Sequence, residues 1–153
     1  MSVLHLLGTA GEGGAETYFV DLATALQRSG VAQAAAIRGH PGRQARLRAA
    51  GLQVEVLRFG GPIDIFTKPR AAAFARRQGV TLALAWMNRA ARHTPKGPWT
   101  RIGRLGGYYN LKYYQGFDHL VANTEDIADW VVGQGWPAGR VSCIPNFAAA
   151  PPQ

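Results

Sequence analysis

The chain has 153 residues and a net charge of +8, and its length fits one globular domain. Hydrophobic residues make up 47% of it, which excludes a disordered protein. No apolar run approaches the roughly 20 residues that a membrane-spanning helix needs, and the first residues lack the basic region of a signal peptide. Cys143 is the single cysteine, which excludes an internal disulfide and a cysteine-based metal site and favours the reducing cytoplasm.

The first half of the chain predicts three strands, each followed by a helix. Short apolar runs indicate buried strands, and apolar residues at helical spacing indicate the helices. Glycines end the helices, and prolines open the second and third. The predicted strands lie at residues 3–7, 33–38 and 54–57, and the predicted helices at 15–26, 41–50 and 69–78.

The second half predicts four more strands, at residues 80–85, 101–105, 119–122 and 141–144. Residues 89–99 are predicted as a loop, residues 110–115 as a short helix, and Thr124 as the cap of the last helix. Alternating strands and helices predict an α/β, Rossmann-like, doubly wound parallel sheet. We expect one domain over residues 1–146 and a linker over residues 147–153.

A glycine-rich turn at residues 8–14 follows the first predicted strand, the usual place for a ligand in a parallel sheet. Glycines let the backbone approach a ligand and adopt positive φ, and the helix N-terminus offers N–H groups to an anion. The Gly-Lys-Ser/Thr of a nucleotide P-loop is absent. The dinucleotide fingerprint G-x-G-x-x-G is also incomplete, because Glu16 occupies the position of its third glycine. The acidic residue expected at the end of the second strand is missing as well, since the chain has Arg38-Gly39-His40 there. A turn that only joins strand to helix is the alternative.

Three segments resemble family-4 glycosyltransferases with the GT-B fold. They are Gly13-Gly14-Ala15-Glu16 before an amphipathic helix, Val121-Ala122-Asn123-Thr124-Glu125, and Val141-Ser142-Cys143-Ile144-Pro145-Asn146-Phe147. Their order and separation fit the family over nearly the whole chain. The resemblance implies the N-terminal, acceptor-side half of a two-domain enzyme.

The resemblance also implies a reaction. Enzymes of this family transfer a sugar from a nucleotide-sugar donor with retention of anomeric configuration, without a metal and without a cofactor, since the donor is a substrate. Their second domain binds the donor and carries a pair of glutamates. We expect that domain to be missing from this chain, which alone should be inactive as a truncated domain.

The glycine turn supplies the first predicted site residues. By the resemblance, Gly11, Gly13 and Gly14 line the cleft near the donor phosphates and the acceptor. Glu16 would accept a hydrogen bond from an acceptor hydroxyl. The alternative is that Glu16 only complements the helix dipole.

The end of the fourth predicted strand supplies three more candidates. Asn88 and Arg89 are expected to bind sugar hydroxyls or a phosphate, the latter through the guanidinium fork. His93 is the candidate general base. The alternative for His93 is an exposed loop histidine.

The ends of the fifth and sixth strands complete the predicted site. Gly107 allows close backbone approach, Tyr108 could stack on a sugar face, and Asn110 follows them. Asn123 and Thr124 lie at the next strand end. The alternatives are tyrosines in the core and a Thr124 that only caps its helix.

The basic residues are concentrated in the middle of the chain. Residues 38–112 carry 15 basic side chains against Glu55 and Asp64, a net charge of +13. This favours an anionic partner, either a lipid-linked acceptor such as lipopolysaccharide or the inner face of a membrane on which a cytoplasmic enzyme is peripheral. The alternatives are a solvated basic face, a non-catalytic nucleic-acid- or anion-binding module, and a GT-B nucleotide-sugar epimerase. Nucleic acid is disfavoured because no known binding motif is present.

Overall fold

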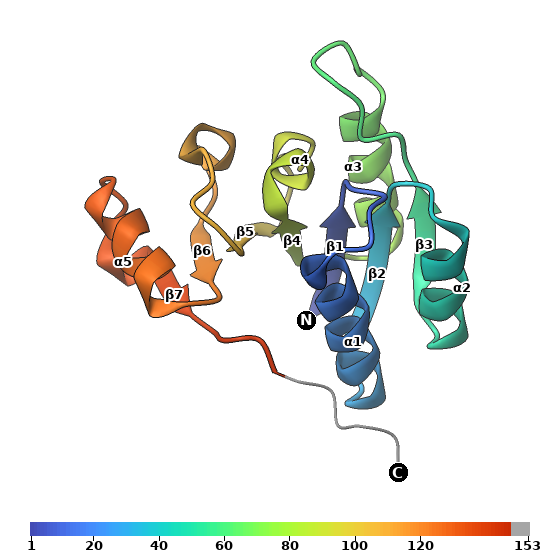
Figure 1. Ribbon diagram of the computed structural model, residues 1–153. Coiled ribbons are helices and arrows are strands. Elements are labelled where there is room, and N and C mark those ends of the chain that lie inside the picture. The colour runs from blue at the N-terminus through green and yellow to red at the C-terminus, as the bar shows by residue number, and fades with distance from the viewer. Residues whose placement is uncertain (148–153) are drawn as a thin grey trace.

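The computed structural model describes residues 1–147 and shows a seven-stranded sheet whose strands all run parallel (Figure 1). The strands are β1 (Ser2–Leu7), β2 (Ala32–Ile37), β3 (Gln53–Val56), β4 (Leu82–Trp86), β5 (Thr100–Leu105), β6 (His119–Ala122) and β7 (Val141–Cys143). The helices are α1 (Gly14–Arg28), α2 (Pro41–Ala49), α3 (Thr67–Arg77), α4 (Met87–Arg92) and α5 (Glu125–Gly133), with 3-10 turns η1 (Leu111–Tyr114) and η2 (Ala138–Arg140).

The strand order is β3-β2-β1-β4-β5-β6-β7. The chain therefore builds outward from β1 in one direction as far as β3, and then continues from β4 on the other side of β1. Such a reversal is where open parallel sheets bind ligands, beyond the carboxyl ends of the strands. The order places the loops that follow β1 and β4 side by side at the centre of that edge.

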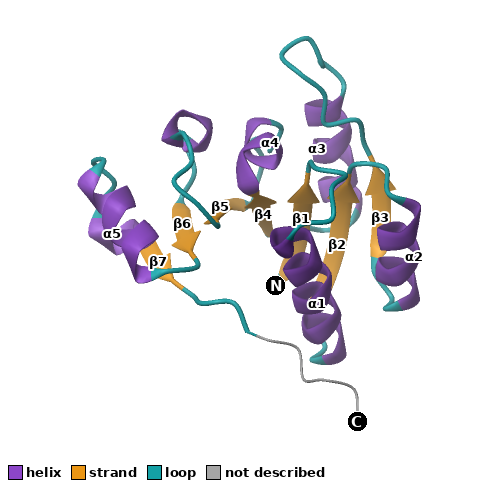
Figure 2. Ribbon diagram, viewed as in Figure 1, coloured by secondary structure: helices purple, strands orange, loops and turns teal. Residues whose placement is uncertain are grey.

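Helices cover the sheet from both sides (Figure 2). On one face, α1 and α2 pack through residues such as Phe19 and Leu47 against Leu7, Ile37 and Trp86. On the other face, α3, α4 and α5 bury a second cluster. The two clusters meet at β2, whose small side chains point alternately into each, so the alanine run suits a strand covered on both faces.

The predicted fold class is confirmed, and most predicted element bounds lie within one or two residues of the observed ones. The main error is the loop predicted at residues 89–99, because α4 occupies Met87–Arg92. This helix follows β4 with no connecting loop. Its N-cap is Trp86, whose side chain makes no capping bond, so the sequence carries none of the usual signs of a helix start.

Close packing around β5 leads to a first expected result. A Cβ added at Gly103 would lie 2.6 Å from Cδ1 of Tyr114 and 2.9 Å from Cδ2 of Leu120, and both side chains are fully buried. We expect Gly103→Ala to lower the free energy of unfolding by about 2 kcal/mol, the usual cost of overpacking a core. The control is Gly14→Ala, where no atom lies within 4 Å. Urea unfolding of both variants measures the difference, and equal stabilities would contradict the packing described here.

Candidate functional site at the carboxyl edge of the sheet

The predicted site residues gather at the carboxyl edge of the sheet. The turn after β1 touches α4, since a Cβ on buried Gly8 would lie 3.0 Å from Cγ of Arg89. The loop after β5 likewise meets the end of β6, where a Cβ on Gly106 would lie 3.6 Å from Nδ2 of Asn123. The four loops that the sequence singled out thus form two neighbouring pairs.

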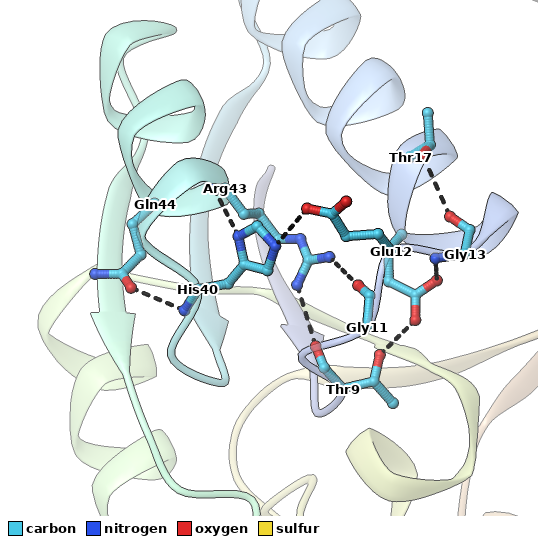
Figure 3. A network of polar contacts seen from close by, with 9 residues as sticks. Thr9, Gly11, Glu12, Gly13, Thr17, His40, Arg43 and Gln44 are labelled. Carbon is cyan, nitrogen blue, oxygen red and sulfur yellow. Dashed lines mark hydrogen bonds and ion pairs between the residues drawn. The ribbon is translucent and has the colours of Figure 1, made fainter.

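Arg43 of α2 holds the glycine turn in place (Figure 3). Its Nη1 donates to the carbonyl oxygen of Thr9 at 3.1 Å, and its Nη2 donates to that of Gly11 at 2.6 Å. The side chain is buried, whereas Gly11 is exposed, so both guanidinium bonds are only partly shielded from water. Because the turn carbonyls face Arg43, an arginine that the sequence analysis did not single out shapes the turn.

His40 joins the same network through both ring nitrogens (Figure 3). The backbone N–H of Arg43 donates to Nδ1 at 3.0 Å, so Nδ1 is unprotonated in this arrangement. The proton therefore lies on Nε2, which donates to the Glu12 carboxylate at 3.1 Å. A pocket of about 270 Å³ lies against these side chains, with Glu16, Thr17 and Arg46 completing much of its wall.

Glu16 organises the start of α1. One carboxylate oxygen accepts from Oγ of Thr9 at 2.8 Å, and the other accepts from the backbone N–H of Gly13 at 3.0 Å. Burial alone would raise the pKa of the Glu16 carboxyl, but these hydrogen bonds, its own backbone N–H and Arg43 outweigh it and lower the pKa. The geometry supports the alternative in which Glu16 complements the helix start, and its contact with an acceptor stays a prediction.

The turn glycines do not adopt the positive φ that the sequence suggested. Among residues 1–147, positive φ occurs at five glycines outside this turn. A side chain at Gly8 would crowd α4, one at Gly11 would make an ordinary contact with Glu16, and one at Gly14 would meet open space. Gly13 is the N-cap of α1. Their contact with phosphates or an acceptor stays a prediction.

The step from β4 to α4 is strained and aims Asn88 at the edge. Met87 has φ 70°, which costs a non-glycine residue about 1–3 kcal/mol and is typical of functional sites. The next residue, Asn88, has a buried side-chain oxygen without a hydrogen-bond partner among the described residues. Asn88 lines a groove of about 240 Å³ together with Arg89, Arg92 and Tyr113. An unpartnered carbonyl in a polar groove suits a ligand hydroxyl.

Arg89 and His93 both bind the loop that follows β3. Nη1 of Arg89 donates to the carbonyl oxygen of Phe59 at 3.0 Å. Nε2 of His93 lies 2.8 Å from the carbonyl oxygen of Gly60 and must donate to it, which leaves Nδ1 as the only basic nitrogen. His93 is buried against Phe59, so the alternative of an exposed loop histidine is wrong. Its role as a general base stays a prediction.

The residues after β5 and β6 fall into two groups. Asn110 accepts from the backbone N–H of Lys112 at 3.0 Å, and Thr124 accepts from that of Ile127 at 3.2 Å, so both are caps. Tyr108 is exposed and packs edge-on against Trp130. Asn123 has a buried side-chain oxygen without a partner in residues 1–147. Like Asn88, Asn123 therefore has a side-chain oxygen that could accept a hydrogen bond from a ligand.

Gly107 lies under its own loop, and this loop brings a further group to the site. A Cβ on Gly107 would lie 3.1 Å from the ring of Tyr109. Burial raises the pKa of the Tyr109 hydroxyl, a backbone hydrogen bond to Gly106 opposes the rise, and the nearby Glu16 carboxylate adds to it. Tyr109 of this loop therefore lies within electrostatic range of the Glu16 carboxylate, although the sequence had not indicated it as a site residue.

Arg104 of β5 holds the segment after β7 and was also missed. Its guanidinium lies 4.8 Å above the ring of Tyr18 and 5.2 Å above that of Trp86, and it donates to Oδ1 of Asn146. Phe147 packs edge-on against Tyr18. An arginine near the end of a strand that becomes buried there was the only sequence signal for this site.

The described residues contain neither a cluster of metal ligands nor a membrane-spanning helix. No group of three His, Cys, Asp or Glu side chains there could hold a metal ion. None of the helices in residues 1–147 combines the length and the apolarity needed to cross a bilayer. Reaction without a metal or cofactor stays a prediction.

Comparison with known proteins identifies the family. Residues 12–148 match Glycosyltransferase Family 4. The chain belongs to this family. Within it, the chain is 37% identical to two lipopolysaccharide core biosynthesis glycosyltransferases of Rhizobium meliloti (strain 1021), LpsD and LpsE. The matches cover 99% of this chain and 45% of LpsD, and 89% of this chain and 41% of LpsE. The chain thus spans less than half the length of these two relatives.

The fold of this family-4 chain is similar to that of Anabaena HepE, whose structure was solved with UDP. The TM-score is 0.71 at 16% identity, over 95% of this chain and 44% of HepE. HepE has also been solved with UDP-glucose. The resemblance deduced from the three sequence segments is therefore confirmed at the level of family and fold.

Proposed function

We propose that this chain is the N-terminal, acceptor-binding domain of a retaining glycosyltransferase. The observation that carries the proposal is the family match over residues 12–148, together with 37% identity to two lipopolysaccharide core glycosyltransferases. The acceptor is an anionic or lipid-linked glycan of the lipopolysaccharide type, and the donor is a nucleotide sugar. The protein acts in the cytoplasm, peripheral to the inner membrane face, and uses no metal or cofactor.

The carboxyl edge gives this proposal a physical basis. Asn88 and Asn123 each offer a buried carbonyl oxygen that lacks a partner among the described residues, and a sugar hydroxyl can donate to either. Tyr109, in the loop after β5, lies within electrostatic range of Glu16 at the start of α1. Because these groups already hold defined positions, they can orient an acceptor for attack on a donor held by a second domain. His93 stays the proposed general base through Nδ1, and it lines the hollow beside Ile65, which shares Arg92 with the groove that contains Asn88.

The proposal is tested with the full-length protein and a panel of nucleotide sugars. We expect transfer from one of them to a lipopolysaccharide-core acceptor, with retained anomeric configuration in the product. If no nucleotide sugar is transferred or hydrolysed, the proposal fails. A product epimerised at the sugar without transfer would instead favour the epimerase alternative.

Asn88→Ala is expected to lower kcat/KM of the full-length enzyme at least tenfold, because it removes a buried hydrogen-bond acceptor, worth about 1–3 kcal/mol, from the acceptor groove. Asn88→Asp keeps an accepting oxygen and should retain more activity than Asn88→Ala. The matched control is Gln53→Ala, which removes an exposed amide at the amino end of β3. Initial rates at several acceptor concentrations measure the effect, and unchanged kinetics in Asn88→Ala would remove this residue from the site.

A further inference from the structure

The loop between β3 and α3 displays three large apolar side chains to solvent. Ile63 is 92% exposed, Ile65 71% and Phe66 63%. The loop rises beyond the carboxyl ends of β1, β2 and β3 (Figure 1). Single exposed apolar residues are common, but three within four positions on a projecting loop mark a surface that another apolar phase covers.

Hydrogen bonds hold the loop in this conformation. One oxygen of Asp64 accepts from the backbone N–H of Gly60 at 2.8 Å and from Oγ of Thr67 at 2.5 Å. The other accepts from the backbone N–H groups of Phe66 and Thr67 at 3.0 and 3.1 Å. The only carboxylate of the loop thus turns inward, and the apolar side chains turn outward.

The base of the loop is fixed to α4. Phe59 is fully buried and has φ 47°, an uncommon conformation for an aromatic residue. Its carbonyl oxygen accepts from Arg89, and that of Gly60 accepts from His93. Exposure of the apolar tip is therefore built into the fold, and little conformational entropy remains to be lost when the tip is covered.

Basic side chains line two hollows at the carboxyl edge of the sheet, one of which lies beside the apolar tip. Lys68 and Arg92 line a hollow of about 430 Å³ beside Ile65. Arg58 and Arg70 line a second hollow of about 370 Å³ at the adjoining ends of β2 and β3. Among the described residues, only Arg70 of these four forms an ion pair, with Glu55 at 3.8 Å.

We propose that the tip residues Ile63, Ile65 and Phe66 insert into the headgroup region of an anionic lipid bilayer. Arg58, Lys68, Arg70 and Arg92 then lie opposite the lipid phosphates. Apolar insertion and attraction to anionic lipids reinforce each other, and each alone gives weak binding. Single-stranded nucleic acid suits this surface less well, because it binds by stacking on aromatic rings, and the tip has one ring and two aliphatic side chains.

This surface also explains how a membrane-embedded acceptor would reach the site, and in this respect it rests on the proposed function. Arg92 lines both the hollow under the tip and the groove that contains Asn88. A lipid-linked glycan held at the bilayer surface would therefore enter the groove from the tip side. The glycine turn and the acceptor groove lie at the same edge of the sheet.

Vesicle flotation of the full-length protein tests the proposal, with phosphatidylcholine vesicles that contain or lack phosphatidylglycerol. We expect binding to the anionic vesicles only. Replacing the three tip residues by serine should weaken it at least tenfold without lowering Tm, since the side chains are exposed. Replacing Arg58, Lys68 and Arg70 by glutamine should weaken it similarly and reduce its dependence on salt.

The matched control replaces three exposed arginines in the last turns of α1, α2 and α3, which face the amino edge of the sheet: Arg28, Arg48 and Arg76. This control removes three positive charges, as the variant at Arg58, Lys68 and Arg70 does, and it should float like the wild type. In a Phe66→Trp variant, the added tryptophan should shift its emission to the blue with anionic vesicles and be quenched by brominated lipids.

Several results would overturn the proposal. The serine variant could float as well as the wild type, or the protein could bind neutral vesicles as well as anionic ones. The control at Arg28, Arg48 and Arg76 could lose as much binding as the variant at Arg58, Lys68 and Arg70. An oligonucleotide could also bind through the tip, in a gel-shift assay, more tightly than the vesicles do. Flotation requires no catalysis, so its failure is distinct from failure of the proposed function. Conversely, a tip variant that no longer floats but still transfers sugar to a water-soluble acceptor fragment would support both inferences.

Discussion

Arg43→Ala is expected to lower the free energy of unfolding by about 3–4 kcal/mol. The change removes two charge-assisted hydrogen bonds, each worth about 1.5–3 kcal/mol, and leaves the carbonyl oxygens of Thr9 and Gly11 without their partner. The guanidinium is buried, so water compensates only in part. Urea unfolding measures the loss. Amide hydrogen exchange should show faster exchange at Gly11 and Gly13, because the turn is no longer held.

Two variants separate the geometry of Arg43 from its charge. Arg43→Lys keeps the charge but has no planar fork to reach both carbonyls, so it should lose most of the same stability. Arg46→Ala removes an equal charge from an exposed side chain of the same helix, 4.0 Å from Asp21, and should cost less than about 1 kcal/mol. If Arg43→Ala and Arg46→Ala have the same stability, Arg43 does not hold the turn.

Acidification from pH 6.5 to 4 is expected to destabilise the fold by about 3 kcal/mol through His5 alone. His5 is fully buried in β1. Its Nδ1 accepts from the indole N–H of Trp86 at 3.1 Å, so its Nε2 carries the proton and donates to Gln33 at 2.7 Å. Burial lowers the pKa of His5 from 6.5 to about 4, although the hydrogen bond to Gln33 opposes the shift. Protonation of His5 would place a hydrogen on Nδ1, which could then no longer accept from the indole N–H of Trp86.

The sign follows from proton binding. Below pH 6.5 the unfolded chain binds a proton at His5 and the folded chain does not, so protonation favours unfolding. The contribution of His5 to the free energy of unfolding is therefore fully present above pH 6.5. It falls by roughly 1.4 kcal/mol per pH unit below that, until His5 of the folded protein titrates near pH 4. Glu16 is an acid rather than a base, but because its pKa is also lowered in the fold, it too makes the protein less stable as the pH falls. Its contribution is present above the ordinary pKa of a glutamate and is lost as the pH falls below about 4.3.

Urea unfolding at several pH values and NMR titration of the imidazoles measure the His5 effect. We expect the His5 ring to stay neutral at pH 5 with its proton on Nε2. His5→Leu should flatten the stability profile between pH 6.5 and 4, whatever its own cost at pH 7. A His5 that titrates near 6.5 in the folded protein would contradict the buried network.

The secondary structure and the family follow from local patterns. Strands such as β1 and helices such as α1 were predicted because apolar spacing, caps and glycine stops act within a few residues. The position of the glycine turn followed from the order of strand and helix. The family resemblance depended on short segments at the strand ends, and the match over residues 12–148 confirms it.

The contacts within the site did not follow from local patterns, because they depend on partners far away in the chain. Arg89, predicted to bind the ligand, and His93, predicted as the general base, each bind a carbonyl about 30 residues earlier in the chain, at Phe59 and Gly60. Their functional roles stay predictions. Arg43 belongs to the second helix, and nothing in its neighbourhood indicates that its guanidinium reaches the first turn. The helix α4 was missed since no capping residue precedes it.

The sequence by itself determined an alternating α/β domain of Glycosyltransferase Family 4, with a glycine turn after its first strand and a concentration of basic residues in its middle. These features depend on the type and spacing of neighbouring residues. Only the tertiary structure decided that Asn88 and Asn123 keep side-chain oxygens without a partner in residues 1–147. It also decided that Arg43 shapes the turn, and that Asp64 faces inward while the tip of its loop stays apolar. Hydrogen bonding and burial join residues far apart in the chain, so they exist only once the sheet has brought its strand ends together.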